Sequence, residues 1–143
     1  MTKSIQISLY LIAAAVAVVL VFEFYVSNTN HSAGGAVELS RPNYSALALE
    51  GEYAFSENCT TCHGVAARGT DKGPPLVHDI YNPGHHPDAS FRRAIAQGTV
   101  QHHWSFGNMP AISDVPNETA AKIIVYIREL QFANGIVYRE HSM

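Results

Sequence analysis

Charged residues are scarce in this chain. They make up 15% of its 143 residues, against about 25% in an ordinary soluble domain. Aspartate and glutamate outnumber lysine and arginine by 12 to 9, so the formal net charge is −3. Because no basic excess is available to neutralise phosphates, the composition disfavours nucleic acid as a partner.

Cysteine and strand-like patterns are also scarce. The two cysteines cannot form a disulfide scaffold or, unaided, a four-thiolate metal site. No internal repeat is present, and apolar and polar residues do not alternate over a useful length between Tyr44 and Met143. The length suits one domain, which we expect to be all-α.

A long apolar segment lies near the N-terminus. It runs from Ile5 to Val26, with only Lys3 as a charge before it. At ~1.5 Å per helical residue it would cross a hydrocarbon core of about 30 Å. A cleaved signal peptide is the alternative, but Glu23 and Phe24 stand where small residues should precede cleavage. We therefore favour an uncleaved transmembrane helix, residues 1–26, with the remainder of the chain exported.

The next segment, residues 27–43, is polar and contains a glycine pair and a proline. It has no hydrophobic period, so it predicts a flexible linker. The remaining residues, 44–143, form the expected folded domain.

Three helices are expected in this domain. The first follows an N-cap at Ser45 and runs to Cys59, the second opens with an N-cap at Asp88 and ends at Gly98, and the third is capped by Asn117 and ends at Asn134. The centre of the third helix, residues 123–127, is apolar on all sides, which predicts deep burial.

Long Gly- and Pro-rich loops separate these helices, and one motif indicates what organises them. The sequence Cys59-Thr60-Thr61-Cys62-His63 has the C-x-x-C-H spacing of covalent haem c attachment. The two thiols add to the haem vinyl groups, and the adjacent imidazole can bind the iron. A redox dithiol and half of a zinc site are the alternatives. The first lacks a βαβ pattern and the second lacks another ligand pair.

The chain resembles the mono-haem class I c-type cytochromes from about residue 45 to residue 134. Besides the haem motif, the matching features are Gly51 and Phe55 on the first helix, Ile123 and Tyr126 on the third, Gly73-Pro74-Pro75-Leu76, and Gly107-Asn108-Met109-Pro110. The resemblance implies a small all-α cytochrome c fold of three or more helices around one covalent haem.

The resemblance also implies roles for single residues. The Pro74 carbonyl would accept a hydrogen bond from the imidazole of His63, and Leu76 would pack on the haem. Met109 would supply its sulfur as the second axial ligand, although a methionine can also only fill space. The indole N–H of Trp104 would donate to a haem propionate, or the ring would pack in the core.

Histidines are unusually frequent between His63 and Met109. They are His78, His85, His86, His102 and His103. The plainest interpretation is a set of half-exposed loop histidines. A second site for copper or zinc and a competing axial ligand to the iron are the alternatives.

The expected function follows from an iron whose two axial positions are filled. Such an iron accepts or releases one electron and coordinates no small-molecule substrate, so we expect an electron carrier and not an enzyme. The expected partners are a protein donor and a protein acceptor of a respiratory or photosynthetic chain, met at the periplasmic side of a bacterial inner membrane. With its acidic balance, the chain lacks the lysine ring that steers mitochondrial relatives to acidic partners.

Two other functions stay open. One is that of the haem c subunit of a larger membrane oxidase or reductase. A haem-based sensor or peroxidase would require Met109 to be absent or labile at the iron.

Overall fold

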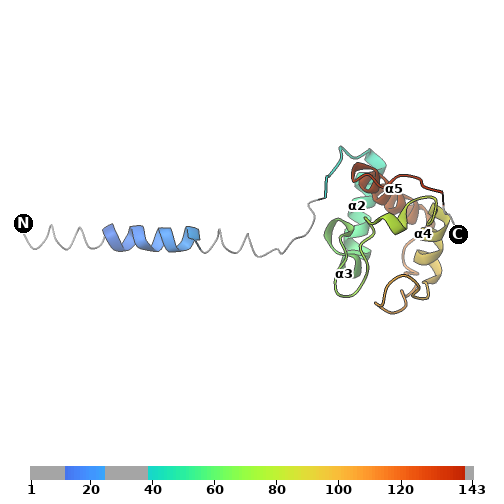
Figure 1. Cartoon of the computed structure of the whole chain (residues 1–143), viewed down its shortest axis with the longest axis horizontal. Coiled ribbons are helices and arrows are strands. Elements are labelled where there is room, and N and C mark those ends of the chain that lie inside the picture. The colour runs from blue at the N-terminus through green and yellow to red at the C-terminus, as the bar shows by residue number, and fades with distance from the viewer. Residues whose placement is uncertain (1–11, 25–38, 141–143) are drawn as a thin grey trace, which may run out of the picture. The chain divides into compact units, whose positions relative to one another are not determined.

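The computed structural model describes residues 12–24 and 39–140, and the chain divides into two compact units, Met1–Glu38 and Leu39–Met143. The second unit is helical (Figure 1). Its elements are α2 (Ala46–Asn58), α3 (Thr60–His63), α4 (Asp88–Gln97), α5 (Asn117–Ala133) and two short 3-10 helices, η1 (Val65–Ala67) and η2 (Asp79–Tyr81). The described residues contain no β-strand, only one isolated bridge between Thr99 and Met109. The all-α prediction is confirmed.

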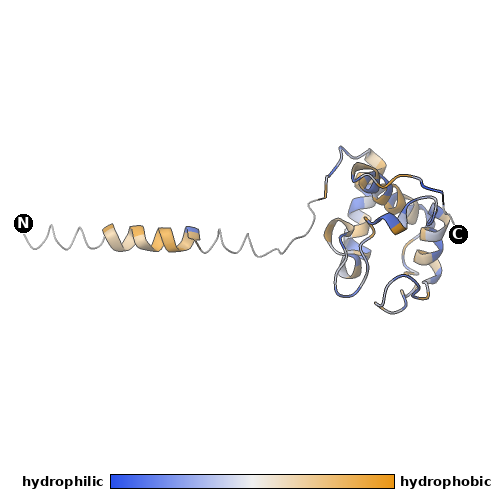
Figure 2. Cartoon of the chain, viewed as in Figure 1, coloured by the Kyte–Doolittle hydropathy of each residue, from blue (hydrophilic) through white to orange (hydrophobic). Residues whose placement is uncertain are grey.

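In the first unit, residues 12–24 form a helix made almost entirely of apolar residues (Figure 2). Across residues 12–24 and 39–140, no helix has both the length and the apolar character needed to span a membrane. The predicted transmembrane segment is longer than this helix, and its residues 5–11 and 25–26 lie outside the described residues, as do residues 27–38 of the predicted linker.

The second compact unit begins at Leu39, five residues before the boundary expected from the sequence. The backbone N–H of Ser40 donates to Oδ1 of Asn134 at 2.8 Å, and Nδ2 of Asn134 donates back to the Ser40 carbonyl at 2.9 Å. Arg41 forms an ion pair with Glu52 of α2. These contacts attach residues 39–43 to the helical domain.

The helix ends follow the sequence only in part. Ser45 is the N-cap of α2, and its Oγ accepts the N–H of Ala48 at 3.2 Å. The N-caps predicted at Asp88 and Asn117 are wrong, because both residues are already helical and the caps are Pro87 and Pro116. Each proline has the φ near −60° that its ring imposes and an extended ψ, which suits the residue before a first turn.

Helices α2 and α5 cross at Gly51, and this crossing is the centre of the core. A Cβ on Gly51 would lie 2.0 Å from the carbonyl oxygen of Lys122. Beside it, the rings of Phe55 and Tyr126 lie 5.5 Å apart in a tilted arrangement. The predicted burial of the centre of α5 holds for Ile123, Ile124, Tyr126 and Ile127, whereas Val125 is half-buried. The missing side chain at residue 51 therefore lets two backbones touch.

Gly51→Ala should destabilise the haem-loaded protein by about 3 kcal/mol, because the new methyl group meets backbone that has no rotamer by which to escape. Chemical denaturation measures the loss. Glu57→Ala, at an exposed position of the same helix, is the control and should change the free energy of unfolding by less than about 0.5 kcal/mol. Equal stability of the Gly51 variant and the parent would contradict the close crossing.

Candidate functional site

The Cys59–His63 motif continues α2 by one tight turn. The N–H of Cys59 donates to the Phe55 carbonyl at 2.9 Å, and the N–H of His63 donates to the Cys59 carbonyl at 2.9 Å. Both cysteines are free thiols. Burial is the main cause that raises the pKa of Cys59 to about 11. Redox dithiols and thiolate metal ligands depend instead on a lowered pKa. The described residues contain no β-strand, so the βαβ setting of a redox dithiol is absent from them.

The imidazole of His63 is buried and oriented. Its Nδ1 lies 2.9 Å from the carbonyl oxygen of Pro74. A carbonyl only accepts, so Nδ1 carries the proton and Nε2 keeps a lone pair. Burial lowers the pKa of His63, against the smaller opposing effect of the Pro74 bond. This hydrogen bond orients the ring and leaves Nε2 as the nitrogen that could bind a metal.

Met109 is held by the only β-type pairing in the described part of the chain. The N–H of Thr99 donates to the Met109 carbonyl at 3.0 Å, and the N–H of Met109 donates to the Thr99 carbonyl at 2.9 Å. Gly98 makes the approach possible, because it has a φ of +74° and a Cβ there would lie 2.4 Å from the Met109 oxygen. Residues 99–109 thus form a loop that is closed by the pairing of its first residue, Thr99, with its last, Met109.

A cavity of about 540 Å³ joins the predicted site residues except Cys62, which is exposed and is not part of the lining. Residues from α2, α3, α4, α5 and the intervening loops line it, among them Cys59, His63, Pro74, Leu76, Trp104 and Met109. Val100 and Phe106, also in the lining, are 71% and 40% exposed, so the cavity opens to solvent on the side of the 99–109 loop. A large, mainly apolar space with the Cys59 thiol, the Met109 thioether and several imidazoles, that of His63 among them, on its wall fits a covalently attached haem.

Two of these residues, Trp104 and Leu76, form hydrogen bonds that the sequence did not predict. The indole N–H of Trp104 donates to the Tyr81 hydroxyl at 3.1 Å. The carbonyl of Leu76 accepts a hydrogen bond of 2.7 Å from Nε2 of Gln131, a fully buried residue of α5. Gln131 lies four residues after the buried Ile127, and this register was the signal in the sequence that could have identified it.

Arg128 is the second residue that sequence reasoning missed. From α5 it donates to the Tyr81 carbonyl at 2.8 Å and to the His86 carbonyl, and it pairs with Asp88 at 2.8 Å. Its guanidinium carbon also lies 4.7 Å from the ring centroid of Phe91. One side chain therefore attaches the loop between η2 and α4 to the C-terminal helix.

The five loop histidines fall into two groups: His78 lies apart from the cavity lining, and the other four belong to it. His78 packs edge-on against Trp104, with ring centroids 5.1 Å apart, and its Nδ1 accepts the N–H of Ile80. The other four lie in the cavity lining and contact one another: the rings of His85 and His86 are 4.5 Å apart and those of His102 and His103 are 4.3 Å apart.

A family model described as "Cytochrome C oxidase, cbb3-type, subunit III" matches residues 46–127, more than half of the chain and the whole of the interval from Cys59 to Met109. The chain belongs to this family of c-type cytochromes. Searches of curated proteins and of solved structures found no significant match.

Membership of this family settles the cofactor and the general activity. A c-type cytochrome carries covalently bound haem c, and Cys59 and Cys62 stand in the C-x-x-C-H motif to which it attaches. The protein is an electron-transfer protein, and its partners are redox proteins.

Proposed function

We propose that this c-type cytochrome is a one-electron carrier whose iron is bound by His63 and Met109. The observation that supports this best is that both side chains line one cavity, which also contains Cys59. His63 offers Nε2 because the Pro74 carbonyl occupies Nδ1, and the Thr99 bridge restrains the backbone of Met109. The haem, when bound, supplies a single-electron redox centre.

Cys59 and Cys62 would form the thioether bonds, and Leu76 would pack on the ring. Trp104 is proposed to stand near the propionates, since it lies on the cavity wall. Its N–H donates to Tyr81, so a hydrogen bond to a propionate would have to replace that one. With His63 and Met109 as its two protein ligands, the haem iron would have no place for a substrate, and the chemistry would be limited to electron exchange with donor and acceptor proteins.

A second candidate, favoured by the description of the matching family, is a haem c subunit of a membrane oxidase. In that case the exposed mouth of the cavity, beside Val100 and Phe106, would face a fixed neighbour and not a diffusing one. The two functions use the same residues and differ in whether the partner dissociates.

For the location we propose the bacterial inner membrane, with the haem domain in the periplasm and residues 1–26 as the anchor. Support comes from the described part of this segment, where Val18, Leu20 and Phe24 are 68%, 64% and 72% exposed. Apolar side chains exposed in this way need a covering such as lipid.

Purification of the full chain from membranes in detergent tests these proposals. We expect a mass that includes one haem and the N-terminal anchor, a single-electron redox titration, and no binding of carbon monoxide to the reduced protein at neutral pH. A carrier should purify alone, whereas an oxidase subunit should bring partners in constant ratio. Ready binding of carbon monoxide would overturn the filled-iron proposal and favour a sensor or peroxidase.

A further inference from the structure

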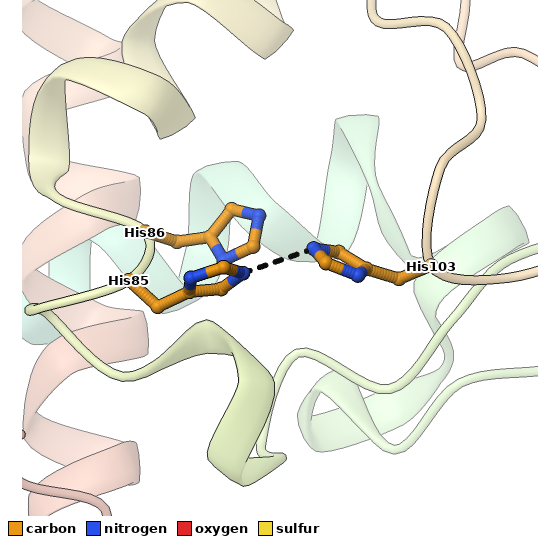
Figure 3. Close-up of side chains that lie close together, drawn as sticks. All are labelled: His85, His86 and His103. Atoms are coloured by element: carbon orange, nitrogen blue, oxygen red, sulfur yellow. Dashed lines mark hydrogen bonds between the residues drawn. The ribbon is translucent and has the colours of Figure 1, made fainter. Parts of the chain in front are cut away.

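Three histidines form a compact cluster on the cavity wall. One ring nitrogen from each of His85, His86 and His103 lies within 4.8 Å of the other two, and Figure 3 shows the three rings gathered between two loops. Nε2 of His85 and Nε2 of His103 are 3.1 Å apart. Nothing in the electron-carrier function requires this grouping.

The spacing suits a metal ion. In a tetrahedral zinc site with Zn–N bonds of about 2.0–2.1 Å, two ligand nitrogens lie about 3.3 Å apart. The separation of 3.1 Å between the His85 and His103 nitrogens is close to this value. One ion could therefore replace the proton between these two rings with a small adjustment of the side chains.

His86 has the second interaction that metal-binding histidines usually show. Its Nδ1 lies 2.7 Å from the carbonyl oxygen of Ile80, so Nδ1 carries the proton and Nε2 has the free lone pair. A backbone carbonyl that orients the imidazole in this way is typical of ligands to zinc and copper. His78 has the opposite arrangement, since its Nδ1 accepts the N–H of Ile80, and it does not join the cluster.

Both loops that carry the cluster are held in place. On one side, Oδ1 of Asn82 accepts the N–H groups of Gly84 and His85 at 2.9 and 3.2 Å, and Arg128 binds the His86 carbonyl. On the other side, His103 belongs to the loop that the Thr99–Met109 bridge closes. Ligands positioned before the ion arrives reduce the entropy lost on binding.

We propose that His85, His86 and His103 bind one divalent transition-metal ion of the kind that prefers imidazole, such as Zn²⁺ or Cu²⁺, and that the ion joins the loop before α4 to the loop of Met109. Three imidazoles with no thiolate or carboxylate in the set match these ions. The fourth position is left for water.

Zinc titration of the haem-loaded full chain in detergent, after removal of metals with a chelator, tests the proposal. We expect one Zn²⁺ per chain by calorimetry and three imidazole nitrogens at about 2.0–2.1 Å by zinc X-ray absorption. His85→Gln and His103→Gln should each weaken binding at least tenfold, and His78→Gln should leave it unchanged. The haem absorption of every variant confirms that it is folded.

Two results would overturn the proposal. One is a haem-loaded parent protein that takes up no zinc. The other is binding that persists in the double variant His85→Gln/His103→Gln, because the ion would then be held by histidines elsewhere in the chain. Neither result bears on the axial ligands His63 and Met109, so the electron-carrier proposal is tested separately.

Discussion

Met109→Ala lowers the midpoint potential of the reduced-to-oxidised transition and opens the iron to carbon monoxide. This result is expected because a neutral, soft thioether favours ferrous iron, and axial ligands set haem potentials over a range of about 0.8 V. We expect a fall on the order of 100 mV, a modest share of that range. A redox titration followed by absorption measures the fall, and carbon monoxide added to the reduced protein reports the open position.

Met109→Leu is the matched control for packing. Leucine fills nearly the same volume as methionine and leaves the Thr99 bridge intact, since that bridge uses only backbone atoms. Both variants should therefore show the lower midpoint potential and bind carbon monoxide when reduced. Only the alanine variant should also lose stability. An unchanged spectrum and midpoint in both variants would remove Met109 from the iron and with it the proposed ligand pair.

Replacing both cysteines, Cys59→Ala/Cys62→Ala, should yield a chain that carries no covalent haem and does not fold. An empty cavity of 540 Å³ at about 24 cal/mol per Å³ costs up to about 13 kcal/mol. The value is an upper bound because the mouth of the cavity admits water. Domains of this size are stable by only about 5–15 kcal/mol, so we expect the haem to be a structural part of the core.

Intact mass of the purified variant measures the loss of covalent haem, and circular dichroism measures the loss of helical structure. Thr61→Ala, an exposed position inside the same motif, is the control and should retain both the haem mass and the helical signal. A double cysteine variant that melts cooperatively with the parent's helical content, yet has no haem, would show that the helices need no haem to pack.

Local patterns explain why much of this site could be predicted. The haem motif occupies five consecutive residues, so its chemistry depends on one turn that short-range hydrogen bonds form by themselves. The burial of Ile123, Ile124, Tyr126 and Ile127 likewise follows from a local pattern, a helical stretch that is apolar on all sides. The N-cap predicted at Ser45 was correct because its side chain accepts an N–H group from the first turn of the same helix. At Asp88 the carboxylate pairs instead with Arg128, forty residues away, which no local pattern records.

The sequence by itself determined the helical class and the haem attachment, because each rests on residues that are neighbours in the chain, and it made His63 and Met109 the proposed iron ligands. Only the tertiary structure decided which histidines meet, how Arg128 and Gln131 attach the loops, and that Trp104 donates to Tyr81. Those contacts join loops rich in glycine and proline, whose paths depend on distant packing partners and not on local propensity.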